Sequence, residues 1–251
     1  MHRAIIAMTV VVLSGSGVLV ATSTAAGAAV GCAGKAYVTN SYDGTVSVID
    51  TATGTVSDTI PVGKGPLGVA ATPDGEHVYV TNIGGGTVSV IRTATRKVSD
   101  TITVGGNPLG VAIAPDGKHA YVTTATKTEM VGNVAVIDPA TRDLSDAILD
   151  ATSGLPYEVA VAHDSKHVYV TNEGGRTVSV IDATKGKVSD TITVGKGPYG
   201  LAITPDGKQV YVTNRDDGTV SVIDTATGNV SAPITVGKKP IDVAICPAQV
   251  A

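Results

Sequence analysis

One short motif recurs five times along the chain and limits what the chain can fold into. Tyr-Val-Thr begins at Tyr37, Tyr79, Tyr121, Tyr169 and Tyr211, so the repeats are spaced by 42, 42, 48 and 42 residues. A period near 42 suits a unit of about four short strands. Such a unit cannot bury both faces of its sheet alone, so neighbouring units must stack against one another.

Each repeat holds four short segments of strand-forming residues, here called A, B, C and D in chain order. One set spans residues 109–113, 119–123, 133–137 and 144–148. Thr-Pro-Asp-Gly at residues 72–75 joins A to B, with Pro and Gly at the second and fourth positions of a type I turn. Phe and Trp are absent, whereas Val, Thr, Ile, Gly and Asp are abundant. The chain is therefore predicted to be all-β, with four-stranded antiparallel sheets.

The two ends of the repeat array complement each other. The array begins with a B segment at residues 36–40 and finishes with an A segment at residues 241–245. Placing the last A beside the first B leaves every edge strand paired. We therefore predict a single domain over residues 29–251, a monomeric five-bladed β-propeller in which one blade is completed by the C-terminal strand beside the N-terminal strand.

The first 28 residues have the pattern of a signal peptide. One basic residue, Arg3, precedes an apolar run over residues 4–20, and Ala-Gly-Ala at residues 26–28 is a cleavage match that leaves Ala29 as the mature N-terminus. An uncleaved anchor is the alternative, disfavoured because Ser and Gly interrupt the run at residues 14–17. Export to the extracellular space or cell surface is expected, with no membrane span in the mature protein.

The chain has two cysteines, Cys32 and Cys246, at opposite ends of the repeat array. Alignment with the intact repeats places them at the first and third positions of one A–B turn, within the distance that a disulfide spans. An exported chain favours such a bridge. The alternative is acylation of Cys32 at a lipoprotein-like box over residues 29–32, which would leave Cys246 as an odd thiol.

Charge and motifs exclude several classes of function. The net charge is −4, and no basic tract is interleaved with aromatic residues, so nucleic acid is not an expected partner. No glycine-rich phosphate loop and no nucleophile elbow occur. The asparagines that end segment B recur regularly, which predicts that their amides satisfy backbone groups of turns.

Two irregularities in the repeats indicate a candidate site. The repeat that begins at Tyr121 carries insertions between B and C, a loop that includes Glu129, and between D and A. Segment A begins with Pro-X-Gly in three copies, but Glu158 and Asp242 replace the Gly in the other two, and Tyr157 and Tyr199 stand at X positions. Both features are predicted to lie on one face, so these five residues are the candidate ligand-binding set.

The motifs resemble those of a known family. Tyr-Val-Thr-Asn at residues 37–40, 79–82, 169–172 and 211–214, together with the Pro-Asp-Gly turns, is similar to the YVTN-type β-propeller repeat proteins of bacterial and archaeal surfaces. The resemblance implies a propeller fold. It extends to surface-layer and adhesion components and to the propellers of lactonases and a lyase, so it implies no single activity.

The favoured interpretation is a secreted or cell-surface, non-catalytic binding propeller whose ligand face is formed by the B–C and D–A loops. Its expected partner is an extracellular macromolecule, a glycan or a small molecule. The alternative is an extracellular lyase- or hydrolase-like enzyme that uses Glu158 and Asp242. No cofactor is predicted, although a pair of carboxylates is also the chemistry that binds a divalent cation such as Ca²⁺.

Overall fold

The structure, a computed structural model, describes residues 34–126, 132–145 and 154–245. These residues form 18 strands and the short 3₁₀ helix η1 (Glu173–Gly175). The strand bounds are β1 (Lys35–Asn40), β2 (Thr45–Asp50), β3 (Thr55–Pro61), β4 (Pro66–Ala71), β5 (His77–Asn82), β6 (Thr87–Arg92), β7 (Lys97–Thr103), β8 (Asn107–Ile113), β9 (Ala120–Ala125), β10 (Gly132–Ile137), β11 (Pro156–Val161), β12 (His167–Asn172), β13 (Thr177–Asp182), β14 (Lys187–Thr193), β15 (Pro198–Ile203), β16 (Gln209–Asn214), β17 (Thr219–Asp224) and β18 (Ile234–Thr235). Within these ranges no helix is long and apolar enough to cross a membrane.

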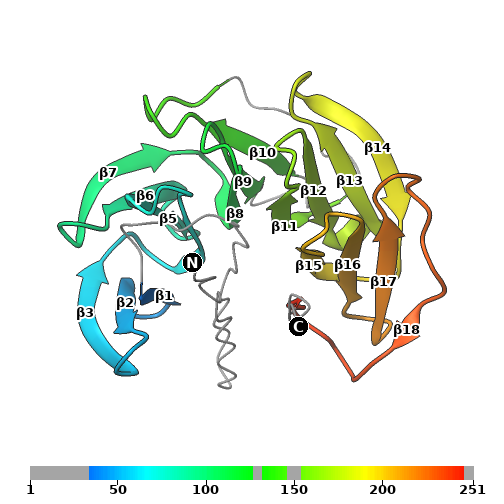
Figure 1. Cartoon of the computed structure of the whole chain (residues 1–251), viewed down its shortest axis with the longest axis horizontal. Coiled ribbons are helices and arrows are strands. Elements are labelled where there is room, and N and C mark those ends of the chain that lie inside the picture. Colours follow the sequence, from blue (N-terminus) through cyan, green and yellow to red (C-terminus); the bar gives the residue numbers. More distant parts are fainter. Residues whose placement is uncertain (1–33, 127–131, 146–153, 246–251) are drawn as a thin grey trace, which may run out of the picture. The chain divides into compact units, whose positions relative to one another are not determined.

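The strands form five antiparallel sheets, which confirms the predicted all-β class. The sheet orders are β1-β2-β3, β4-β5-β6-β7, β10-β9-β8, β11-β12-β13-β14 and β15-β16-β17-β18. Figure 1 shows the strands of each four-stranded sheet side by side in chain order. The chain divides into two compact units, unit 1 (Met1–Ile113) and unit 2 (Ala114–Ala251).

Three predicted strands differ from the observed ones. Leu144 makes one isolated bridge to Ile137 where a D strand was expected over residues 144–148, of which 146–148 lie outside the described residues. The last D strand is only β18. Residues 241–245, where an A strand was expected, are not in a strand.

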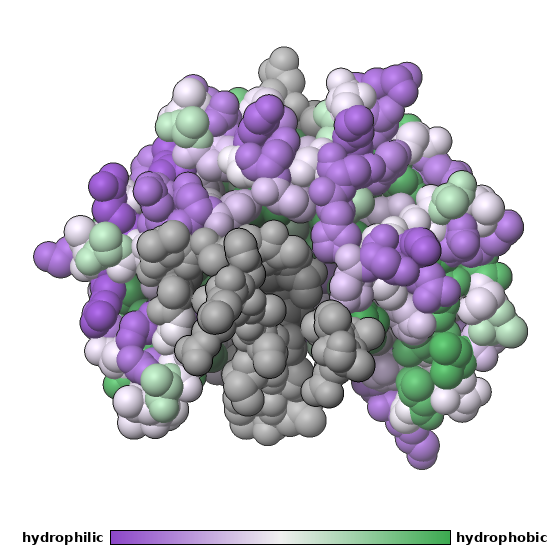
Figure 2. Space-filling view, in the orientation of Figure 1, coloured by the Kyte–Doolittle hydropathy of each residue, from purple (hydrophilic) through white to green (hydrophobic). Residues whose placement is uncertain are grey.

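Hydrophobic side chains remain exposed around the short strand β18. Ile234 lies in this strand, and Val230 and Val236 flank it; all three are exposed. Figure 2 shows hydrophobic residues gathered on the side where Figure 1 places β18. The incomplete D strand therefore leaves apolar surface at the edge of the last sheet.

The hydrophobic core lies between facing sheets. In unit 1, Val46 and Val48 of β2 pack against Val78 and Val80 of β5, and all four are fully buried. In unit 2, residues of β13 and β14 pack in the same way against β15 and β16. Both faces of these B strands are covered, because consecutive residues of β5 and β12 are buried, the polar Thr and Asn of the motif included.

The Thr of each Tyr-Val-Thr motif links its sheet to strand A of the following repeat. In unit 1, the Oγ1 of Thr81 donates a hydrogen bond to the carbonyl of Leu109 over 2.6 Å. Equivalent bonds run from Thr39 to Leu67, from Thr123 to Tyr157, from Thr171 to Tyr199 and from Thr213 to Ile241. The motif Thr therefore positions the X residue of the next Pro-X-Gly segment.

The motif Asn is structural, and its role is wider than predicted. The Nδ2 of Asn214 donates to Thr219 Oγ1 at 3.0 Å and to Ser221 Oγ at 2.9 Å, and its Oδ1 accepts from the Gly195 N–H at 3.1 Å. The bond to Gly195 confirms the predicted contact with turn backbone. The bonds to strand C hydroxyls were not predicted; the same bonds recur at the Asn of β5 and of β12.

Candidate functional site

Strand A in unit 2 begins with an irregularity that places the candidate side chains. In β11 the pairing with β12 shifts register between Pro156 and Val159, and β15 shows the same shift. Tyr157 and Glu158 therefore lie outside the regular ladder. The N–H of Glu158 instead donates to Thr171 Oγ1 at 3.0 Å, and Thr171 in turn donates to the carbonyl of Tyr199 at 2.8 Å. A bulge of this kind changes the direction in which side chains point, here at the start of two neighbouring A strands.

Tyr157 and Tyr199 form a stacked pair. Their ring centroids lie 3.7 Å apart at an interplanar angle of 33°, and the hydroxyl of Tyr199 donates a hydrogen bond to that of Tyr157. Burial is the largest cause that raises the pKa of both phenols; the hydrogen bond with Tyr199 raises the pKa of Tyr157 further, and the charge of Glu173 raises both. Both tyrosines are therefore neutral at physiological pH, and each is only partly buried.

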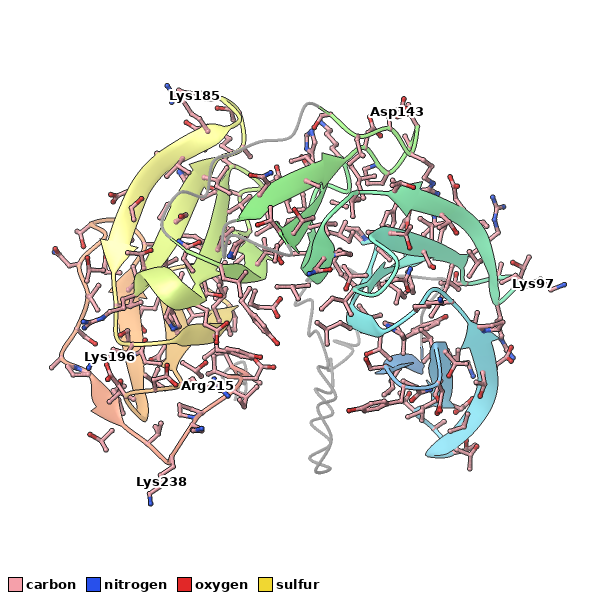
Figure 3. The ribbon with its side chains drawn as sticks, turned by 180° about the vertical axis from the view of Figure 1, so that it is seen from behind. Lys97, Asp143, Lys185, Lys196, Arg215 and Lys238 are labelled. Carbon is pink, nitrogen blue, oxygen red and sulfur yellow. The ribbon has the colours of Figure 1, made fainter. Side chains whose placement is uncertain are left out.

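Arg215 and Glu173 extend this cluster. The guanidinium carbon of Arg215 lies 5.5 Å from the centre of the Tyr199 ring, a cation–π distance. Its Nη1 is 3.7 Å from Oε1 of Glu173 and 3.9 Å from Oδ1 of Asp216. Figure 3 labels Arg215, which comes from the loop that follows β16.

Sequence reasoning missed Arg215 and Glu173. Each directly follows a motif Asn, and the equivalent residues of two other repeats are Ser41 and Ile83. The sequence therefore shows an acidic and a basic residue at the same repeat position, just after the motif Asn, in adjacent repeats. Their closeness in space was not predictable, because it depends on how the loops after two B strands approach each other.

The carboxyl group of Glu158 has a pKa far above its ordinary value. Burial, the larger cause, and the negative charge of Asp242 raise the pKa of Glu158 to about 8, although the Val159 N–H donates to its Oε1 at 3.2 Å. The pKa of Asp242 is raised as well, by desolvation of its carboxyl group. Near pH 7 Glu158 is therefore mainly protonated, and the charge of Asp242 contributes to that state.

Gly200 allows Asp242 to approach strand β15. Its N–H donates to the carbonyl of Ile241 at 2.9 Å, and Thr213 Oγ1 donates to the same carbonyl at 3.0 Å. A Cβ atom at Gly200 would lie 2.6 Å from Asp242 Oδ1 and 2.6 Å from the Ile241 carbonyl oxygen. Only glycine therefore fits at position 200, in the A strand between the A segments that carry Glu158 and Asp242.

The structure thus brings together four of the five predicted ligand-binding residues: Tyr157, Glu158, Tyr199 and Asp242. Glu129 lies outside the described residues, as do Cys32 and Cys246. In the ranges that the structure describes, no group of three or more His, Cys, Asp or Glu side chains is placed to hold a metal ion. Glu158 and Asp242 would supply only two carboxyl groups to a cation.

The repeated sheets and the match to a family model define the chain as a β-propeller protein. It belongs to the YNCE-like beta-propeller family, whose model matches residues 4–135 and 134–247. This confirms the resemblance to YVTN-type propellers. No curated protein matches the chain.

Two solved structures illustrate the similarity. The chain is 27% identical to the hydrazine synthase of Kuenenia stuttgartiensis, with a TM-score of 0.72 over 82% of this chain and 64% of that one. It is 18% identical to a functionally unknown protein from Desulfotomaculum acetoxidans, with a TM-score of 0.73 over 83% of this chain and 68% of that one. The chain therefore spans less than two thirds of the hydrazine synthase chain, and the second likeness shows the fold alone.

Proposed function

We propose that this protein is an exported, non-catalytic binding propeller that recognises an extracellular macromolecule, glycan or small molecule through the B–C and D–A loops of unit 2. The observation that carries the proposal is the stacked pair Tyr157–Tyr199, flanked by Glu158, Asp242 and Arg215. Partly exposed aromatic rings beside a few convergent polar groups are typical of ligand sites. Binding residues are also often found on loops and strand ends that a rigid scaffold positions.

A binding screen with a matched pair of tyrosine variants tests this proposal. Residues 29–251 would be screened by thermal shift against glycans, cell-wall fragments and small organic molecules. We expect Tyr199→Leu to weaken binding of a hit at least tenfold. Tyr42→Leu is the control, because Tyr42 is 96% exposed and lies in unit 1. Equal binding by wild type and Tyr199→Leu would place the ligand elsewhere.

The second candidate is a lyase- or hydrolase-like enzyme, and the raised pKa of Glu158 favours it. A carboxylic acid with a pKa of about 8, protonated for the most part near pH 7, is suited to donate that proton to a leaving group. Turnover of an ester or lactone that is lost in Glu158→Gln would support this candidate over simple binding. A Ca²⁺ ion bound by both carboxylates would first require Glu158 to release its proton.

We further propose that the five sheets close into a monomeric ring, with residues 241–245 beside the N-terminal strand and a disulfide between Cys32 and Cys246. The carbonyl of Ile241 accepts a hydrogen bond from the Oγ1 of Thr213. The carbonyl of Tyr199, the X residue of a complete A strand, accepts the same kind of bond from the preceding motif Thr. This supports reading residues 241–245 as the start of a further blade. The sheet that contains β1 starts with a B strand, so it lacks an A strand of its own in chain order.

Mass spectrometry of the secreted protein tests export, ring closure and the disulfide together. We expect a monomer that begins at Ala29 and is two hydrogen atoms lighter than the reduced chain. Two alkylatable thiols in the folded protein would contradict the disulfide. A lipid adduct on Cys32 would favour the lipoprotein alternative, and an obligate oligomer would contradict closure within one chain.

A further inference from the structure

Arg215 in the candidate site has two carboxylates beside its charge but lacks close hydrogen-bond partners among the described residues. Its Nε is buried without a hydrogen-bond partner, while 32% of the side chain is exposed. The two carboxylates nearest its Nη1, at 3.7 and 3.9 Å, belong to Glu173 and Asp216 and lie beyond hydrogen-bond distance. A guanidinium has five N–H donors, and a buried donor without a partner is costly. A ligand cannot reach the buried Nε, but it can supply hydrogen-bond partners to the exposed part of the same guanidinium.

The surroundings of Arg215 orient it for recognition of a planar anion. The Tyr199 ring lies 5.5 Å from the guanidinium carbon, and Tyr199 is itself held by Tyr157. Stacking on an aromatic ring reduces the freedom of the guanidinium, whose fork of donors matches both oxygens of a carboxylate. Its own carboxylate neighbours do not use that fork, because their oxygens lie 3.7 and 3.9 Å from Nη1, beyond hydrogen-bond distance.

The charges around Arg215 favour a singly charged anion over a phosphate. Glu173 and Asp216 lie within 4 Å of Nη1, and Asp217 accepts a hydrogen bond from the N–H of the nearby Lys196. These carboxylates repel any anion, but a doubly charged phosphate meets about twice the repulsion that a monocarboxylate meets. Glu158, which directly follows Tyr157 and is mainly protonated near pH 7, adds a neutral hydrogen-bond donor to the cluster.

We propose that Arg215, held by Tyr199, binds the carboxylate group of the ligand. This inference rests on the proposed binding function and names the ligand class: a monocarboxylate, supplied either by a uronic acid of a glycan or by the C-terminus of a peptide. The carboxylate accepts two N–H bonds from the guanidinium, and the rest of the ligand extends toward the tyrosine pair.

Two matched pairs of probes test the ligand class on the protein of residues 29–251. Glucuronate is compared with glucose, and N-acetyl-dialanine with its C-terminal amide, by calorimetric titration at pH 6.5. We expect the carboxylate of at least one pair to bind at least tenfold more tightly than its neutral partner. The pair that shows the preference identifies the source. Equal affinity within both pairs, or tighter binding of inorganic phosphate, would overturn the proposal.

Variants of Arg215 test the residue assignment. Arg215→Gln should abolish the preference for the carboxylate, whereas Arg215→Lys should keep part of it, because the ammonium retains the charge without the fork. Arg96→Gln is the control; Arg96 is in unit 1, with its Nη1 4.0 Å from Asp58. Circular dichroism at 25 °C verifies folding of each variant. An unchanged preference in folded Arg215→Gln would overturn the assignment.

The outcomes separate this inference from the proposed function. A ligand that needs Tyr199 but carries no carboxylate would refute the inference and leave the binding function standing. No ligand at all in the broad screen, with no preference in either probe pair, would count against both.

Discussion

Replacing Asn214 by Ala is expected to lower the free energy of unfolding by about 2–4 kcal/mol, since several buried groups lose their partners at once. Asn214 is fully buried and makes three hydrogen bonds, to Thr219, Ser221 and the backbone of Gly195. Its removal leaves the Gly195 N–H and two hydroxyls without this partner. Urea unfolding followed by circular dichroism measures the change.

Asn172→Ala is the matched comparison within the same unit. Asn172 is equally buried and donates to Thr177 and Ser179, but its Oδ1 has no hydrogen-bond partner. We therefore expect the loss at this position to be smaller than at Asn214 by about 1 kcal/mol, the net value of one hydrogen bond. Equal losses would show that the bond to Gly195 contributes nothing to stability.

The Glu158→Gln substitution should stabilise the protein in a pH-dependent manner. The pKa of Glu158 is about 8 in the folded chain against an ordinary value of 4.5, so between these values the folded chain holds a proton that the unfolded chain has released. The free energy of unfolding therefore falls as pH rises through this window. Glutamine removes that penalty and keeps an oxygen for the Val159 N–H.

At pH 8 we expect Glu158→Gln to be more stable than wild type by about 2 kcal/mol, less than the full shift implies because Glu158 is partly exposed. Below pH 4.5 the carboxyl group is neutral in both states, so the difference should vanish. Urea titrations at pH 4 and pH 8 measure both values. Glu76→Gln, at an exposed glutamate of unit 1, is the control. A gain of the same size at pH 4 would contradict the burial of a protonated Glu158.

These two predictions differ in how far the sequence anticipated them. The regular recurrence of Asn214 and its equivalents indicated a structural role, and the repeat spacing predicted the sheets that contain them. The pKa shift of Glu158 was not predictable, because it depends on burial and on Asp242, which lies 84 residues away in the chain. Sequence alignment placed both acids at one repeat position and left their separation open.

The sequence by itself determined the all-β class, the repeat period, the family and the candidate positions Tyr157, Glu158, Tyr199 and Asp242. These follow from local patterns, since turn residues, strand alternation and departures from a repeat are read within about 40 residues. Only the tertiary structure decided that Tyr157 and Tyr199 stack, that Glu158 keeps its proton and that Arg215 joins them. Those properties arise where strands of successive repeats meet, because desolvation, ring contacts and charge interactions depend on distances through space rather than along the chain.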